Sequence, residues 1–106
     1  NISLGFSTAH IALSVNSKLK QIACEVYIPD SKQLFLDLSE NKKAIENELS
    51  EKLDWNELPG KKASRIKLAS KGDIFEQGQW LNYHSWMFAK VIAFQDVFSH
   101  YIKTVG

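Results

Sequence analysis

The sequence lacks several features that would indicate a particular type of protein. Its 106 residues include a single cysteine, Cys24, so no intramolecular disulfide can form, and a metal site built from several thiolates is excluded. No apolar run approaches the roughly 20 residues that a membrane-spanning helix needs. The net charge of +1 is too small to indicate a partner. These features predict a protein of the reducing cytoplasm with no membrane partner.

Residues suited to catalysis or metal binding are scattered along the chain. The three histidines, which share no metal-binding spacing, are His10, His84 and His100. Pro29-Asp30 and Glu40-Asn41-Lys42 match the letters of a PD-(D/E)XK nuclease, but a helix is predicted there, and it would place Glu40 and Lys42 on different faces. We therefore expect no catalytic residue, no metal and no cofactor in this chain.

What the chain does contain is the composition of one globular domain. Apolar residues make up 44% and charged residues 24%, which is ordinary for a folded protein. The sequence opens on an alternating apolar pattern and not on methionine. We interpret residues 1–106 as a single accessory domain from the C-terminal part of a longer protein.

Alternating apolar residues predict two pairs of strands. The alternation at residues 2–6 resumes at 11–15, which indicates one long bent strand or two short ones, and a partner strand follows at 22–28. The second pair is expected at 53–58 and 63–70, around a Pro-Gly turn. Cys24 alternates with inward-facing residues, so we expect a buried, inert thiol.

A helical period predicts two long helices. The first should run from about 31 to 52 with Asp30 as its cap, and the second from Gln77 or Gly78 to about 103. The fold class is then α+β: an antiparallel sheet of about four strands with two long helices on one face, in the order β-β-α-β-β-α.

The second helix has more apolar residues than one core needs. They are Trp80, Leu81, Tyr83, Trp86, Met87, Phe88, Val91, Ile92, Phe94, Val97, Phe98, Tyr101 and Ile102. Together they cover more than the roughly 100° arc that faces a single core. Either the core takes nearly all of them, or the surplus docks on a homodimer mate or on another part of the parent protein.

A basic cluster follows the Pro-Gly turn. Lys61, Lys62, Arg65, Lys67 and Lys71 occur without an intervening acid, close to Trp55. Such a strand face could contact the phosphates of DNA or RNA. Alternatively, these residues are solvated and keep a sheet edge from pairing, as lysines often do.

Three segments carry a family resemblance. They are residues 26–35, the motif L-x-W-x-x-L-P-x-K-K-x-S-R-I at 53–66, and a last stretch with Trp80, Trp86 and 94–98. Through them the chain resembles an uncharacterised bacterial and archaeal domain family, commonly found C-terminal to domains that look like PD-(D/E)XK nucleases. The resemblance implies a role in nucleic-acid processing or defence systems, with any nuclease chemistry in another domain.

The positions that match the family are Trp55, Lys61, Lys62, Ser64, Arg65, Trp80 and Trp86. We expect the tryptophans to serve an interface or packing, and Ser64 and Arg65 to fix the hairpin onto the second helix. The resulting hypothesis is a non-catalytic accessory domain of a nuclease-like parent that contacts DNA or RNA through Lys61, Lys62, Arg65 and Lys67. The alternative is a protein-interaction or dimerisation module that uses the apolar surplus of the last helix.

Overall fold

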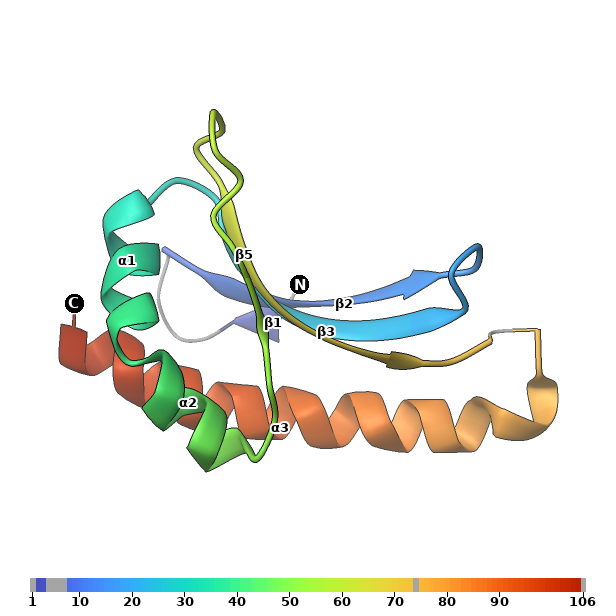
Figure 1. The fold of residues 1–106 in the computed structure, drawn as a ribbon. Helices are drawn as coiled ribbons and strands as arrows, with labels where there is room; N and C mark the ends of the chain where they lie inside the picture. The colour runs from blue at the N-terminus through green and yellow to red at the C-terminus, as the bar shows by residue number, and fades with distance from the viewer. Residues whose placement is uncertain (1, 4–7, 74, 106) are drawn as a thin grey trace.

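The fold is an antiparallel sheet that shares one core with three α-helices (Figure 1). A computed structural model describes residues 2–3, 8–73 and 75–105. The strands are β1 (Ile2–Ser3), β2 (His10–Asn16), β3 (Gln21–Ile28), β4 (Asp54–Asn56) and β5 (Ser64–Lys71), in the sheet order β1-β2-β3-β5-β4. The helices are α1 (Lys32–Glu40), α2 (Lys42–Leu49), the short 3-10 helix η1 (Gln77–Gln79) and α3 (Trp80–Val105). The α+β class and the antiparallel sheet are confirmed, but the predicted order of elements is not.

The N-terminal strands form two short segments and not one bent strand. β1 pairs antiparallel with β2, with Ile2 opposite Ile11, while positions 4 and 6 of the predicted alternation lie outside the described residues. β2 and β3 form the predicted hairpin, in which Leu13 lies opposite Cys24. Of the two alternatives predicted for this segment, two short strands is therefore the one found, and the sheet has five strands in place of about four.

Alternation along the strands separates a dry face of the sheet from a polar one. On β3, Cys24 and Val26 are fully buried in the core, and Ile66 of β5 lies opposite Val26. Tyr27, the residue after Val26, lies opposite Arg65 and belongs to the other face. Apolar residues of all three α-helices join the core on the dry face, as expected for a sheet covered on one side.

The predicted helix over residues 31–52 is wrong, because two shorter helices occupy this segment. Asn41 interrupts them: its N–H donates to the carbonyl of Leu38 at 3.0 Å, while its side-chain amide donates to the carbonyl of Asp37 at 3.2 Å. When a side chain donates a hydrogen bond to a helical carbonyl, it competes with the backbone N–H that would otherwise bond there, and the regular helix can end. The cap also differs from the prediction, since Ser31, and not Asp30, accepts the N–H of Leu34 at 3.2 Å.

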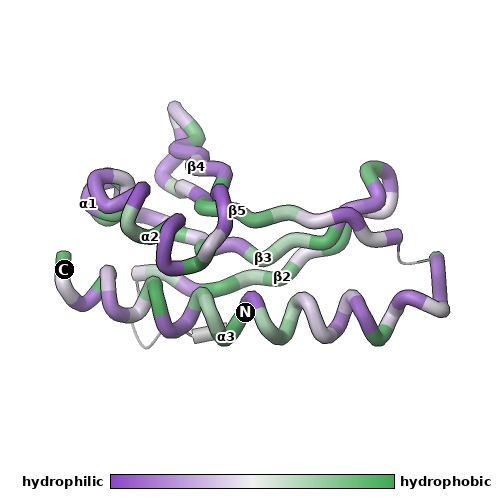
Figure 2. Tube along the Cα trace, turned by 60° about the horizontal axis from the view of Figure 1, so that its bottom comes forward, coloured by the Kyte–Doolittle hydropathy of each residue, from purple (hydrophilic) through white to green (hydrophobic). Residues whose placement is uncertain are grey.

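The last helix begins and ends close to the predicted positions. η1 leads into α3, which runs on from Trp80 to Val105. Figures 1 and 2 show α1 and α2 beside the C-terminal half of α3, whereas its N-terminal half extends under the far ends of β2, β3 and β5. Lys90 bonds to Glu51 at 2.9 Å, and Tyr101 donates to Glu48 of α2. The two halves of α3 therefore have different neighbours.

Candidate interaction surfaces

The loop between β4 and β5 forms a tight turn with two lysines at its tip. The N–H of Lys61 donates to the carbonyl of Leu58 at 3.1 Å, and Gly60 lies at φ 84°, a backbone region that glycine enters without strain. Pro59 precedes it and is pre-set for the second position of such a turn. Lys61 and Lys62 are both exposed there.

Lys32 of α1 anchors this loop from beneath. Its Nζ donates to the carbonyls of Ala63 at 2.7 Å and Leu58 at 3.3 Å, to the Oγ of Ser64 at 3.2 Å, and also to the carbonyl of Glu57. Ser64 is fully buried and donates to the carbonyl of Glu57 at 3.1 Å. Ser64 thus fixes the loop onto α1, not onto the last helix as we expected.

Arg65 is paired with a buried carboxylate. Its Nη1 lies 3.0 Å from Oε1 of Glu25, and its guanidinium carbon lies 5.0 Å from the centre of the Tyr27 ring. Glu25 is 4% exposed, and its Oε2 has no hydrogen-bond partner among the described residues. The positive charge of Arg65 is therefore largely compensated, although 47% of its side chain remains accessible.

The predicted basic cluster is consequently split in two. Lys67 lies on the polar sheet face, in register with Glu25 on one side and Asp54 on the other. Lys61 and Lys62 occupy the loop tip, where no ion pair to them is found in residues 2–3, 8–73 and 75–105. This lysine pair keeps the character of a free basic site, and Lys71, at the far end of β5, is exposed but separate from it.

Trp55 is a packing residue. Its indole N–H donates to Oε2 of Glu46 at 3.2 Å, its ring contacts Phe35 at a centroid distance of 6.4 Å, and Lys42 Nζ lies 5.5 Å from the ring centre. Glu46 also accepts the N–H of Leu53 at 2.8 Å, and this bond is the largest cause of its lowered pKa. Trp55 therefore holds β4 against α2.

The other two tryptophans differ in their surroundings. Trp86 is partly buried against the core, whereas Trp80 remains 47% exposed at the start of α3. Trp80 also borders a cavity of about 450 Å³ between the β2–β3 hairpin and α3. The residues that line it are Val15, Ile22, Phe75, Trp80, Tyr83, His84 and Met87.

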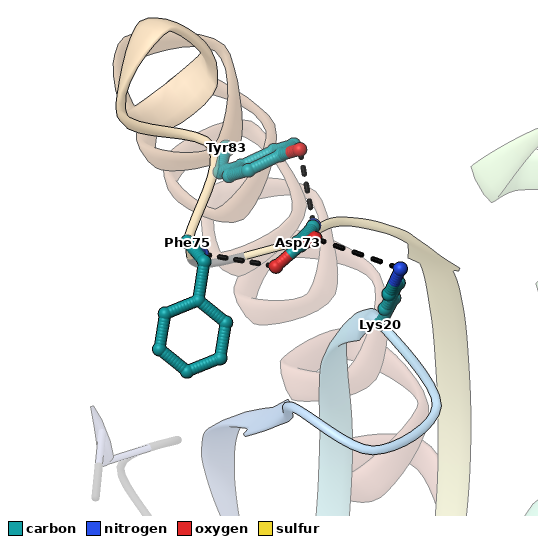
Figure 3. A network of polar contacts seen from close by, with 4 residues as sticks. All are labelled: Lys20, Asp73, Phe75 and Tyr83. Atoms are coloured by element: carbon teal, nitrogen blue, oxygen red, sulfur yellow. Dashed lines mark hydrogen bonds and ion pairs between the residues drawn. The ribbon is translucent and has the colours of Figure 1, made fainter.

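A polar network fixes the turn beside this cavity (Figure 3). The hydroxyl of Tyr83 accepts the N–H of Asp73 at 3.0 Å, and Oδ1 of Asp73 accepts the N–H of Phe75 at 3.0 Å. Lys20, in the β2–β3 turn, reaches the same carboxylate at 3.9 Å. The network ties the start of α3 to the end of the β2–β3 hairpin.

An apolar surface lies along the side of α3 that α2 leaves uncovered. We call it the open flank, and it consists of Leu13 (41% exposed), Val15 (46%), Leu81 (78%), Phe88 (68%) and Ile92 (44%). The α3 members recur at spacings of seven and four and so share one stripe. At about 100° per residue, Phe88 lies roughly 160° around the helix from Lys90, which bonds to Glu51 just beyond the end of α2. The apolar surplus of the last helix is thus only partly taken up by the core.

Other chemistry is sparse in the described part of the chain. No three histidine, cysteine or acidic side chains in this part lie close enough to hold a metal ion. Cys24 is fully buried as predicted, and burial raises its pKa to about 12. None of the helices formed by the described residues has both the length and the apolar character required to cross a bilayer.

Comparison with known proteins identifies one family. A family model described as a domain of unknown function (DUF4268) matches residues 1–102. No curated protein and no solved structure matches the chain. The match covers nearly the whole sequence and includes both the basic loop and the open flank.

Proposed function

The chain belongs to the DUF4268 family, and we propose that it is a non-catalytic accessory domain that docks on protein through its open flank. One observation carries this proposal: α3 exposes Leu81, Phe88 and Ile92 along one stripe, and β2 also exposes large apolar side chains. Scattered apolar residues are normal on a protein surface, but a contiguous patch marks an interaction site. For the nuclease-like parent that the resemblance implies, such docking would serve assembly.

The energetics favour a modest, reversible contact. Fully burying one large aliphatic or aromatic side chain yields roughly 1.5–3 kcal/mol, and the five members of the open flank are already partly buried. Their combined gain is comparable with the estimated cost of about 4–15 kcal/mol for losing translational and rotational freedom. Further contacts at the rim, such as Trp80, would then set the affinity.

Site-specific photocrosslinking tests the proposal. A photoreactive residue at position 88 of the open flank is compared with one at position 43, where Lys43 is exposed on α2. Position 88 is expected to give a defined protein adduct that Leu81→Ser abolishes, and position 43 none. Equal yields from the two positions, or an adduct that survives Leu81→Ser, would rule out docking through this surface.

A second candidate function is contact with DNA or RNA through the loop tip. It is favoured by Lys61 and Lys62, which are exposed on a loop that Lys32 holds in place. Arg65 and Lys67 would contribute from the neighbouring sheet face, although Glu25 offsets part of their charge. Such a surface would bind phosphates with a salt slope of about −0.9 per neutralised phosphate on duplex DNA.

Charge reversal at the tip separates this candidate from the first. Lys61→Glu with Lys62→Glu is expected to abolish binding of short DNA and RNA at low salt, with the melting temperature nearly unchanged. Lys18→Glu, in the exposed β2–β3 turn, serves as the matched control and should preserve binding. No binding by the wild-type chain at low salt would eliminate the nucleic-acid candidate without affecting the docking proposal.

A further inference from the structure

The polar face of the sheet adjoins the loop between β4 and β5, which carries the two lysines of the tip. We propose that this face binds a single strand of nucleic acid by stacking its bases on a row of planar side chains. The inference rests on the nucleic-acid contact proposed above as the second candidate function. The tip lysines would hold the phosphates of the same strand, and the row would hold its bases.

Four strands each place one planar group in a single row across the polar face. The strand register aligns these groups in the order His10, Tyr27, Arg65 and Asn56, and we call them the planar row. The rings of His10 and Tyr27 are 5.3 Å apart, and the guanidinium carbon of Arg65 lies 5.0 Å from the centre of the Tyr27 ring. At about 4.8 Å from strand to strand, the planar row spans about 14 Å.

The planar row has the chemistry that unpaired bases bind. Single-stranded bases stack on histidine and tyrosine rings and on the guanidinium plane of arginine, and some four-stranded sheets hold two or three bases in this way. His10 and Tyr27 are partly exposed, and 47% of the Arg65 side chain is accessible. Three neighbouring members of the planar row can therefore meet a base.

The planar row is held in place by other parts of the fold. Glu25 bonds to Arg65 at 3.0 Å, and the Oδ1 of Asn56 accepts the N–H of Leu58 at 3.3 Å. Side chains that are already fixed lose little conformational freedom when a ligand binds. More of the stacking energy then appears as affinity.

The charge around the planar row suits a polyanion. The segment 57–65 joins the loop tip to the planar row and contains three cations and a single acid, Glu57. Because Glu25 already pairs with Arg65, this arginine serves mainly as a stacking plane, and the tip lysines serve as the phosphate contacts. The bases and the phosphates of one strand thus meet different side chains of one continuous surface.

None of the helices formed by the described residues covers this face. Their apolar residues join the core on the opposite side, and Figure 1 shows β2 and β3 without a helix on the side away from α3. β1 pairs with β2 at its edge, so it widens the sheet and does not cover it. The face is therefore open to a ligand.

The shape of the face favours a single strand over a duplex. The major groove of B-DNA is about 12 Å wide and admits a helix or a two-stranded ribbon, whereas the planar row crosses four strands of one sheet. Farther along the same face, Ala23 lies opposite Ser14 on one side and Ala69 on the other. These short side chains let an extended strand approach the sheet closely.

Fluorescence anisotropy with labelled oligonucleotides tests the proposal. A single strand of about 12 nucleotides, offered as DNA and as RNA, is compared at low salt with the DNA duplex of the same sequence. At least one of the two single strands should bind about fivefold or more tightly than the duplex, as expected for the stacking of one base. Duplex binding that equals or exceeds the binding of both single strands would overturn the proposal.

Substitutions in the planar row locate the contact. Tyr27→Leu removes one ring and should weaken single-strand binding about fivefold or more, whereas Tyr27→Phe keeps the ring and should bind as the wild type does. His100→Leu removes an exposed ring from α3 and is the matched control, with unchanged binding expected. Wild-type affinity in a folded Tyr27→Leu variant would contradict stacking on the planar row.

A measurement on the wild-type chain covers the case in which Tyr27→Leu fails to fold. A single strand that carries 5-iodouracil is photocrosslinked, and the attached peptides are mapped by mass spectrometry. The adducts should fall on His10 or Tyr27 and not on Trp80, which is 47% exposed at the start of α3. Adducts found only outside the planar row would overturn the proposal.

Charge reversal at the loop tip separates this proposal from the contact on which it rests. If Lys61→Glu with Lys62→Glu abolishes binding while Tyr27→Leu binds as the wild type does, contact through the tip stands and stacking is overturned. If the wild-type chain binds none of the oligonucleotides, both are removed.

Discussion

The Nζ of Lys32 lies 3.2 Å from the Oγ of Ser64, and together these side chains close the loop between β4 and β5 from below. Lys32 supplies donors to the carbonyls of the loop, while Ser64 donates to the carbonyl of Glu57. Buried carbonyls are costly when they lack donors. This pair therefore gives a physical reason for Ser64 in the motif at 53–66 and for Lys32 in the other matching segment, 26–35.

Removing the ammonium should loosen this loop and destabilise the domain. Lys32→Met keeps most of the aliphatic stem but leaves the carbonyls of Leu58 and Ala63 without this donor. Hydrogen bonds to a charged group are each worth roughly 1.5–3 kcal/mol, so we expect a loss of about that size. Urea unfolding measures it, with Lys43→Met on the exposed face of α2 as control. Equal midpoints for the two variants would contradict the anchoring role.

Arg65 should matter more for stability than its exposure suggests. Arg65→Gln leaves Glu25, which is 4% exposed, without its charged partner, and an unsatisfied buried group costs roughly 1–3 kcal/mol. Lys67→Gln, on the same face of β5, is the control and should cost less. If thermal unfolding shows the two variants to be equally stable, the pair between Arg65 and Glu25 contributes nothing.

Stability should fall on acidification, in part through Glu46. The N–H groups of Leu53 and Trp55 favour the carboxylate, so its pKa is lowered in the folded state. A group with a lowered folded pKa stabilises the fold above the ordinary glutamate pKa, and this contribution is lost as the pH falls through the folded value. Glu46→Gln should therefore flatten the dependence of the urea midpoint on pH below about 5.

Glu40→Gln, exposed at the end of α1, provides the comparison for this titration. That variant should retain the slope of the wild-type chain. An unchanged slope for Glu46→Gln would mean that its two hydrogen bonds do not distinguish the folded from the unfolded state.

Replacing Gly72 or Gly78 with alanine should change the stability of the domain in opposite directions. A Cβ at Gly72 would lie 2.9 Å from Cγ2 of Ile22, whose side chain is buried, so overpacking of roughly 1–3 kcal/mol is expected. At Gly78 a Cβ meets nothing within 4 Å, and alanine should stabilise by about 0.4–1 kcal/mol through the unfolded chain. Melting temperatures report both, and a neutral Gly72→Ala would show that Ile22 can move aside.

The periodic patterns of apolar residues predicted the positions of individual strands and helices. Alternation located β3, and the helical period located α3 to within a few residues at both ends. The break at Asn41 was not predicted, because Leu38 and Ile45 are seven residues, or about two helical turns, apart. The pattern of buried apolar residues therefore continues across it as in one helix. Its only local signal was an asparagine, which favours caps and turns.

Contacts between distant segments could not be predicted in the same way. Arg65 meets Glu25 because β3 and β5 pair in one register, and the sequence gives no measure of that register. The cluster read as uniformly basic therefore contains one compensated cation. The exposed apolar residues of α3 correspond to one of the two alternatives that the sequence left open, because the number of apolar residues on one helix can be compared with the arc that one core needs.

The uneven support of α3 has a dynamic consequence. All four of its buried residues, Val91, Phe94, Phe98 and Ile102, lie in the C-terminal part. The turns from Trp80 to Lys90 bury none, so they should open by local fraying at a lower free energy than the rest of the domain. Amide protons in these turns would then exchange first. Any molecule that binds to them would raise the free energy needed to unfold this half of the helix.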